Sequence, residues 1–89
     1  MKTFVKNLFS PHGNPVPNQY EITAEDGARI FQSYKSIIAQ VKNGKITLDE
    51  MYWNYSSTTS KYLYIFLNLD RKEVAEMIKK GEIQFANLN

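Results

Sequence analysis

The chain has 89 residues, no cysteine, and eleven Lys and Arg against nine Asp and Glu, for a formal net charge of +2. This length predicts one small domain over residues 1–89, near the lower limit for unaided folding, and leaves the oligomeric state open. The missing cysteines exclude disulfides and thiolate metal sites, and the even charge balance argues against a duplex-DNA-binding protein or an acidic nucleic-acid mimic. The N-terminus lacks a signal-peptide pattern and no apolar run has the length of a membrane span, so we expect a cytosolic protein with no membrane partner.

The first quarter of the chain predicts strands joined by a long loop. Residues 3–9 are typical of a short first strand, and residues 10–18, which hold all three prolines and the only histidine, predict an extended loop. Residues 20–23 alternate apolar and polar side chains, as a half-buried strand does. Glu25-Asp26-Gly27 then predicts a tight turn.

Residues 28–42 permit two interpretations. Their apolar side chains recur at helical spacing, but most of them favour strands or are neutral in a helix. Asn43-Gly44 follows and is a strong hairpin signal, because both residue types tolerate a positive φ. Gly44 would serve equally as the C-terminal stop of a helix. We favour a strand meander over the helix.

The last third of the chain predicts helices and a closing strand. The continuous apolar run Tyr62–Leu67 follows a cluster of Ser and Thr, which indicates a short buried helix over residues 59–67. Asp70-x-x-Glu73 is a capping box, and it predicts a second helix over about residues 71–80. Residues 82–88 alternate as a strand does. The expected fold is therefore α+β, a small antiparallel β meander packed by one or two C-terminal helices and closed by a C-terminal strand.

Catalytic and metal-binding patterns are sparse in this sequence. The glycines form no phosphate-cradling motif, and His12 is a lone histidine in a loop rich in proline. The neighbouring acids Asp49 and Glu50 would point to opposite sides of a strand, which does not suit a general acid–base pair. We therefore predict a protein that is not an enzyme, with no catalytic residue, no cofactor and no metal.

The candidate site is an aromatic segment at residues 52–66, which holds six of the twelve aromatic residues and the only tryptophan. One interpretation assigns its rings to the core, with Trp53, Tyr62 and Phe66 buried. The other exposes part of the segment as a partner-binding surface, because Tyr and Trp often anchor protein interfaces. Rings near Lys42, Lys45 and Lys61 would also suit stacking on unpaired bases of single-stranded nucleic acid. The candidate partner-binding residues are Tyr52, Tyr55, Ser56, Thr58, Thr59, Lys61 and Tyr62.

Several blocks of the sequence resemble a family of short bacteriophage proteins of unknown function, over roughly residues 14–89. The most specific block is Tyr55-Ser56-x-Thr58-Thr59-x-Lys61-Tyr62, and an arginine commonly follows that tyrosine in the family where this chain has Leu63. Weaker matches are Asn18-Gln19-Tyr20, Gly27, Phe31-Gln32-Ser33-Tyr34, Ile37-Ile38-Ala39, Trp53, Phe66-Leu67 and Leu88-Asn89.

The resemblance implies a context rather than a mechanism, since it carries no catalytic residues. It leads us to expect a phage accessory protein in the host bacterial cytoplasm that binds and inhibits or modulates a bacterial host protein. Components of CRISPR and other defence systems are the targets that such a context suggests, which would make the protein an anti-CRISPR or anti-defence factor. A single-stranded nucleic-acid-binding accessory protein is the alternative, and a virion assembly protein is a third.

Overall fold

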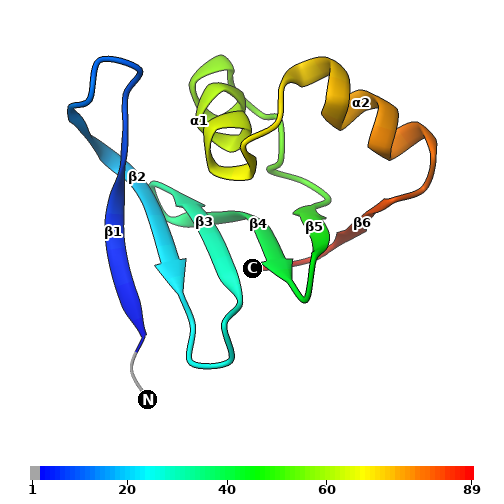
Figure 1. The fold of residues 1–89 in the computed structure, drawn as a ribbon, viewed down its shortest axis with the longest axis horizontal. Coiled ribbons are helices and arrows are strands. Elements are labelled where there is room, and N and C mark those ends of the chain that lie inside the picture. Colours follow the sequence, from blue (N-terminus) through cyan, green and yellow to red (C-terminus); the bar gives the residue numbers. More distant parts are fainter. Residues whose placement is uncertain (1–2) are drawn as a thin grey trace.

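The computed structural model describes residues 3–89, which form six strands and two helices in an α+β arrangement (Figure 1). The sheet order follows the chain from β1 to β6; neighbours from β1 to β5 are antiparallel, and β6 runs parallel to β5. Both helices lie over the same face of the sheet, so the predicted fold class is confirmed. In chain order the elements are β1 (Phe4–Phe9), β2 (Pro15–Thr23), β3 (Arg29–Ser33), β4 (Ser36–Lys42), β5 (Lys45–Asp49), α1 (Ser57–Leu67), α2 (Arg71–Lys79) and β6 (Ile83–Ala86).

The meander predicted for residues 28–42 is confirmed as β3 and β4, and the helical alternative is wrong. Lys42 pairs with Lys45 across a two-residue turn formed by Asn43 and Gly44. These turn residues have φ angles of 53° and 75°, the left-handed values that a tight hairpin turn of this kind requires. The local turn signal therefore outweighs the helical spacing of the apolar side chains.

The loop expected over residues 10–18 is only partly present, because Pro15 to Asn18 belong to β2. This half of β2 pairs with β1, where Pro15 lies opposite Phe9, and it extends past the end of β3, whose last residue Ser33 pairs with Gln19. The prolines of β2 have no N–H group, but none of them lies opposite β3, so no hydrogen bond between β2 and β3 is lost. Proline is tolerated in a strand under these conditions, which explains why the proline-rich composition did not prevent a strand.

Both predicted helices are confirmed, and each begins at a residue that caps it. The Ser56 hydroxyl accepts a hydrogen bond from the backbone N–H of Thr59, and α1 ends at Asn68 in the left-handed conformation with φ 56°. At α2, the side chain of Asp70 accepts from the N–H of Glu73 at 2.7 Å, and the Glu73 side chain accepts from the N–H of Asp70 at 3.0 Å. This is the capping box that the sequence predicts.

The core lies between the helices and the helix-facing side of the sheet. Its centre is a stacked pair formed by Phe31 of β3 and Phe66 of α1, whose ring centroids are 5.7 Å apart. Val74 of α2 and Ile83 of β6 extend this core toward the far end of the sheet. The other buried apolar residues of the cluster are Leu8, Ile38, Ala39, Ile46, Leu48, Tyr62 and Leu63.

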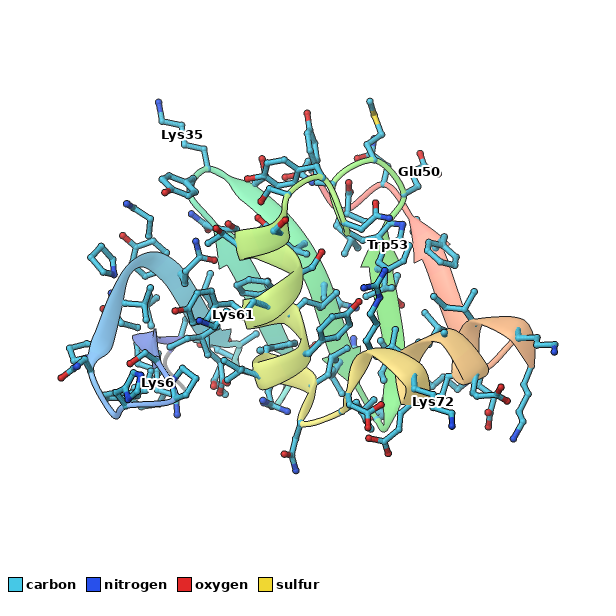
Figure 2. All side chains as sticks on the ribbon, turned by 90° about the horizontal axis from the view of Figure 1, so that it is seen from above. Lys6, Lys35, Glu50, Trp53, Lys61 and Lys72 are labelled. Atoms are coloured by element: carbon cyan, nitrogen blue, oxygen red, sulfur yellow. The ribbon has the colours of Figure 1, made fainter. Side chains whose placement is uncertain are left out.

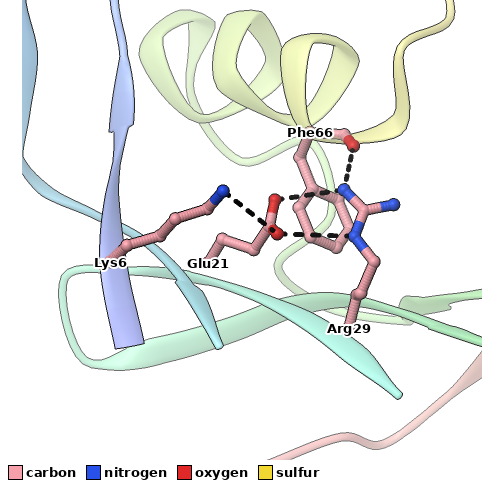
Figure 3. A network of polar contacts seen from close by, with 4 residues as sticks. All are labelled: Lys6, Glu21, Arg29 and Phe66. Carbon is pink, nitrogen blue, oxygen red and sulfur yellow. Dashed lines mark hydrogen bonds and ion pairs between the residues drawn. The ribbon is translucent and has the colours of Figure 1, made fainter. Parts of the chain in front are cut away.

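A charged network ties the first three strands to the end of α1 (Figure 3). The Glu21 carboxylate of β2 lies 3.8 Å from Lys6 Nζ of β1 and accepts a 3.0 Å hydrogen bond from the guanidinium of Arg29 on β3. Arg29 also donates to the carbonyl of Phe66 at 2.9 Å, and its guanidinium carbon lies 4.7 Å from the centroid of the Phe66 ring. The network therefore holds the end of α1 over β3, while the opposite side of α1 faces solvent.

Candidate functional site

The candidate site begins with residues 50–56, which connect β5 to α1 and carry exposed rings. The connection is held at its base by Asp49, the last residue of β5. One carboxylate oxygen of Asp49 accepts hydrogen bonds from the backbone N–H groups of Met51 at 3.1 Å and Tyr52 at 2.9 Å. The Asp49 carbonyl accepts another from the N–H of Trp53 at 3.2 Å. Chains often turn where a side-chain oxygen accepts hydrogen bonds from the backbone N–H groups of the next few residues.

The second oxygen of the buried Asp49 carboxylate binds the C-terminal segment. It accepts hydrogen bonds from the backbone N–H of Leu88 at 2.8 Å and from Nδ2 of Asn89 at 3.0 Å. Burial raises the pKa of Asp49, but the hydrogen bonds from Leu88, Tyr52, Asn89 and Met51 more than offset this, so its pKa lies below the usual value. Asp49 is therefore an ionised group that joins two remote segments.

The side chains of the connection divide between solvent and the core. The rings of Tyr52 and Tyr55 are exposed and meet edge to face, with centroids 5.9 Å apart and planes at 82°. Trp53 is half-buried, and its ring meets that of Phe85 on β6 at 5.9 Å. With its exposed neighbour Met51, the tyrosine pair forms what we call the aromatic surface: Met51, Tyr52 and Tyr55.

Beside the aromatic surface lies an open hollow of about 590 Å³ between the connection, α1 and the first turn of α2. Rings of Trp53, Tyr55 and Tyr64 line it together with the cationic residues Lys61 and Arg71, and hydroxyl groups of α1 supply the polar part of its wall. Figure 2 looks down on this side of the molecule and labels Trp53 on the connection and Lys61 on α1. The hollow therefore combines flat apolar surfaces, hydroxyl groups and positive charge.

The structure brings only some of the predicted partner-binding residues to the surface. Tyr52, Tyr55, Thr58 and Lys61 are exposed, and of these Tyr55 and Lys61 line the hollow together with the helix-capping Ser56.

Thr59 and Tyr62, in contrast, are only 1% and 7% exposed, so their placement on a contact surface is corrected. The buried face of α1 consists of residues 59, 62, 63 and 66, whose spacing puts them on one side of a helix, against the sheet. Thr59 Oγ1 accepts a hydrogen bond from Ser56 Oγ at 3.0 Å and lies 3.2 Å from Ser33 Oγ of β3. Thr59 thus belongs to the internal contact between α1 and the sheet.

The expected grouping of Lys42, Lys45 and Lys61 is not found. Lys42 and Lys45 flank the β4–β5 turn and line a separate hollow there, and Lys42 Nζ lies 3.0 Å from the carboxylate of Asp26. The cation that joins Lys61 at the aromatic hollow is Arg71, the first residue of α2, which was not among the predicted partner-binding residues. Tyr64 was likewise missed, although its position three residues after Lys61 places it on the same side of α1.

Within residues 3–89, no group of three or more His, Asp or Glu side chains is placed to hold a metal ion. In the same part of the chain, neither helix is long and apolar enough to cross a membrane. The groups at the candidate site are rings, hydroxyl groups and cations, whose chemistry is suited to binding through stacking, hydrogen bonds and attraction of negative charge.

The fold and the site together define a small α+β domain with an aromatic surface and an adjoining cationic hollow. By sequence, the chain belongs to a family of unknown function, DUF8033, whose model matches residues 5–84. The match includes both helices and all of the residues that line the hollow. No match was found among curated proteins or among solved structures.

Proposed function

We propose that this protein is a non-enzymatic phage accessory protein that binds a bacterial host protein and inhibits or modulates it in the host cytoplasm. The observation that carries the proposal is the exposed Tyr52–Tyr55 pair beside an open hollow. Tyrosine provides a large, rigid contact area and is enriched among the residues that dominate protein interfaces. The resemblance of the Tyr55–Tyr62 block to short bacteriophage proteins is the reason for expecting a bacterial partner, with a component of CRISPR or another defence system as the leading target.

The anchoring of the connection supports this proposal. Asp49 holds the backbone of Met51 and Tyr52, so the two tyrosine rings project from a fixed base rather than from a free loop. A surface that is already ordered loses less conformational freedom when a partner binds. The aromatic surface is thus suited to a specific protein contact.

Replacing Tyr55, Thr58 and Lys61 together by alanine is expected to abolish capture of the host protein and to leave thermal stability nearly unchanged. All three side chains are exposed, and exposed substitutions usually alter stability by less than about 0.5 kcal/mol. The measurement is co-purification of the tagged protein from nuclease-treated bacterial lysate, read by mass spectrometry, with melting followed by circular dichroism.

The matched control replaces three exposed residues of α2, Lys72, Glu76 and Lys79, by alanine. This control should retain the same host protein as the unaltered chain. A host protein retained equally by both triple variants would place the interface elsewhere. Unfolding of the first variant would instead assign its residues a role in stability.

Single-stranded nucleic-acid binding is the second candidate, and the composition of the hollow favours it. Trp53, Tyr55 and Tyr64 offer flat surfaces for bases, and Lys61 and Arg71 offer charge for phosphate groups. Trp53 is the only tryptophan in the chain, so its fluorescence reports directly on this hollow.

If the hollow binds single strands, an oligonucleotide should quench Trp53 fluorescence, and added salt should weaken the binding because cations are released from the phosphates. The variant Arg71→Ala should bind more weakly and show a smaller salt dependence. A titration that stays flat at low salt would remove this candidate and leave the protein-binding proposal intact.

A further inference from the structure

The first strand of the sheet has an unpaired outer edge. β1 lies at one end of the strand order and pairs with β2, and no other strand within residues 3–89 covers its far side (Figure 1). Three apolar side chains of this edge strand are largely exposed: Phe4 at 66%, Val5 at 62% and Phe9 at 53%. Proteins usually protect such an edge with charge, proline or a covering segment, because it can pair with another chain. The one charged side chain of β1, Lys6, lies instead near Glu21 of β2, at 3.8 Å.

The hydrogen bonds of the first hairpin define which backbone groups of β1 face outward. Ser10 donates its N–H to the carbonyl of Asn14 at 2.8 Å, so the polar groups of Ser10 point toward β2. Because the register with β2 shifts between Asn7 and Phe9, the direction of residues 4–7 follows from β2 instead. Ala24 donates its N–H to the carbonyl of Ala28 on the β3 side at 2.8 Å, so backbone alternation turns Glu21 and Thr23 toward β1, and their partners Lys6 and Phe4 toward β2. The backbone groups of Val5, Asn7 and Phe9 therefore point away from the sheet.

The side chains of these three residues share one face of the sheet. Lys6 lies opposite Glu21, which in turn lies opposite Phe31, a residue of the helix-covered core. Residues on either side of Lys6 consequently point to the uncovered face, and Val5 lies beside Ile22 of β2 on that face. Phe9 lies opposite Pro15, whose neighbour Val16 packs against the core, so Phe9 also points to the uncovered face. The side chain of Asn7 is bonded within the sheet, since its Nδ2 donates to the carbonyl of Val16 at 2.9 Å. Val5 and Phe9 thus present both backbone groups and side chains to an incoming strand, and Asn7 presents its backbone groups.

We propose that this edge is the dimer interface, with β1 pairing antiparallel with β1 of a second copy around a two-fold axis through Asn7. In this register Val5 lies opposite Phe9 of the second copy and Phe9 lies opposite its Val5. The outward N–H and C=O groups of residues 5, 7 and 9 all find partners. The side chains of Val5 and Phe9 also cover one another on the face of the sheet that carries no helix.

Charge and spacing select this register over its neighbours. A register shifted by one residue along each strand places the axis at Lys6, which brings two lysines directly opposite each other and is unfavourable. An axis at Val5 pairs Val5 with itself and places Phe9 opposite residue 1, outside the described residues. An axis at Leu8 places Val5 opposite Pro11, which has no N–H to donate. Pairing about Asn7 instead places Lys6 opposite Leu8. The strand is therefore complementary to itself in one register, as a two-fold interface requires.

The proposal is tested by the mass of the protein in solution and by variants that place charged side chains at Val5 and Phe9. Sedimentation equilibrium should give twice the 10.3 kDa mass of the chain, with dissociation on dilution. The double variant Val5→Lys with Phe9→Lys places like charges opposite each other and should be monomeric. The double variant Val5→Glu with Phe9→Lys places opposite charges at both contacts and should restore the dimer. Because both side chains are exposed, all of these variants should keep the circular dichroism spectrum of the folded chain.

A matched control introduces two lysines on the helix-covered side, by Met51→Lys with Ile65→Lys, and should remain dimeric. A monomeric unaltered chain at the highest accessible concentration would overturn the proposal. So would a Val5→Lys, Phe9→Lys variant that still dimerises, or a control that does not. Failure of the Val5→Glu, Phe9→Lys variant to recover the dimer would reject the register about Asn7. None of these results depends on whether the aromatic surface binds a host protein.

Discussion

Replacing Asp49 by asparagine is expected to lower the free energy of unfolding by about 3 kcal/mol. The amide oxygen can still accept the two hydrogen bonds on one side, from Leu88 and Asn89. The amide nitrogen, however, would face the N–H groups of Met51 and Tyr52, which would lose their acceptor. Two unsatisfied N–H groups and a repulsive contact account for the size of the loss. Urea denaturation at neutral pH, followed by circular dichroism, measures it.

The same carboxylate is expected to make stability depend on acid pH. Because the pKa of Asp49 in the folded protein lies below its unfolded value of 3.8, its contribution is fully present above that value and is lost as the pH falls through the folded pKa. The unaltered chain should therefore lose stability as the pH falls below 3.8. The Asp49→Asn variant should show a shallower decline, so the two curves should converge in acid.

Asp26 provides a control for Asp49 on the protein surface. Its pKa is also lowered, first by the hydrogen bond from the backbone N–H of Ala28 and then by Lys42, but its carboxylate is exposed. The variant Asp26→Asn should therefore change stability much less than Asp49→Asn. Equal losses from the two variants would contradict the role of Asp49 as a buried link between segments.

Replacing Phe66 by alanine should have the largest effect on folding, a loss of about 3–5 kcal/mol. Phe66 is only 2% exposed, stacks on Phe31 and lies under the guanidinium of Arg29. Its removal leaves a cavity between α1 and β3 and takes away a ring contact for that guanidinium. For a domain whose total stability is of the order of 5–15 kcal/mol, this is a large fraction. Thermal melting should shift downward by roughly 4–8 °C for each kcal/mol lost.

Phe4→Ala is the matched control for the Phe66 variant, since it removes the same side chain from the exposed surface of β1. The melting temperature should hardly move, because solvent already surrounds that ring. If both alanine variants melt close to the unaltered chain, α1 does not pack on the sheet through Phe66 and the core described above is wrong.

Local signals in the sequence were sufficient to predict most of the elements. Asn43-Gly44 specified the β4–β5 turn by its tolerance of positive φ, and Asp70 with Glu73 specified the start of α2. Such signals depend on a few consecutive residues, so they can be interpreted without knowing the fold. The strand at Pro15 was missed because its acceptability depends on where β3 ends, which is a property of the assembled sheet.

The division of the aromatic segment between core and surface required the structure. Tyr62 to Leu67 is apolar throughout, so its composition does not reveal which side of α1 faces the sheet. The helix phase, set by the cap at Ser56 and by the contact of Phe66 with Phe31, decides that Tyr62 is buried and Lys61 exposed. The presence of Arg71 at the hollow depends in turn on the angle at which α2 follows α1, which no local pattern specifies.

The parallel pairing of β6 with β5 has a consequence for the order of folding. Strands β1 to β5 are joined by short turns, so their contacts can form early and close to one another along the chain. β6 can reach β5 only after the chain has passed through both helices. Contacts between remote segments have a higher entropic barrier to formation and slow the folding of small domains. The hydrogen bonds of Asn89 to Ile37, at 2.8 Å and 2.9 Å, span an even longer separation. Closure of the sheet by β6 and the docking of Asn89 should therefore be the last step of folding, after the meander has assembled.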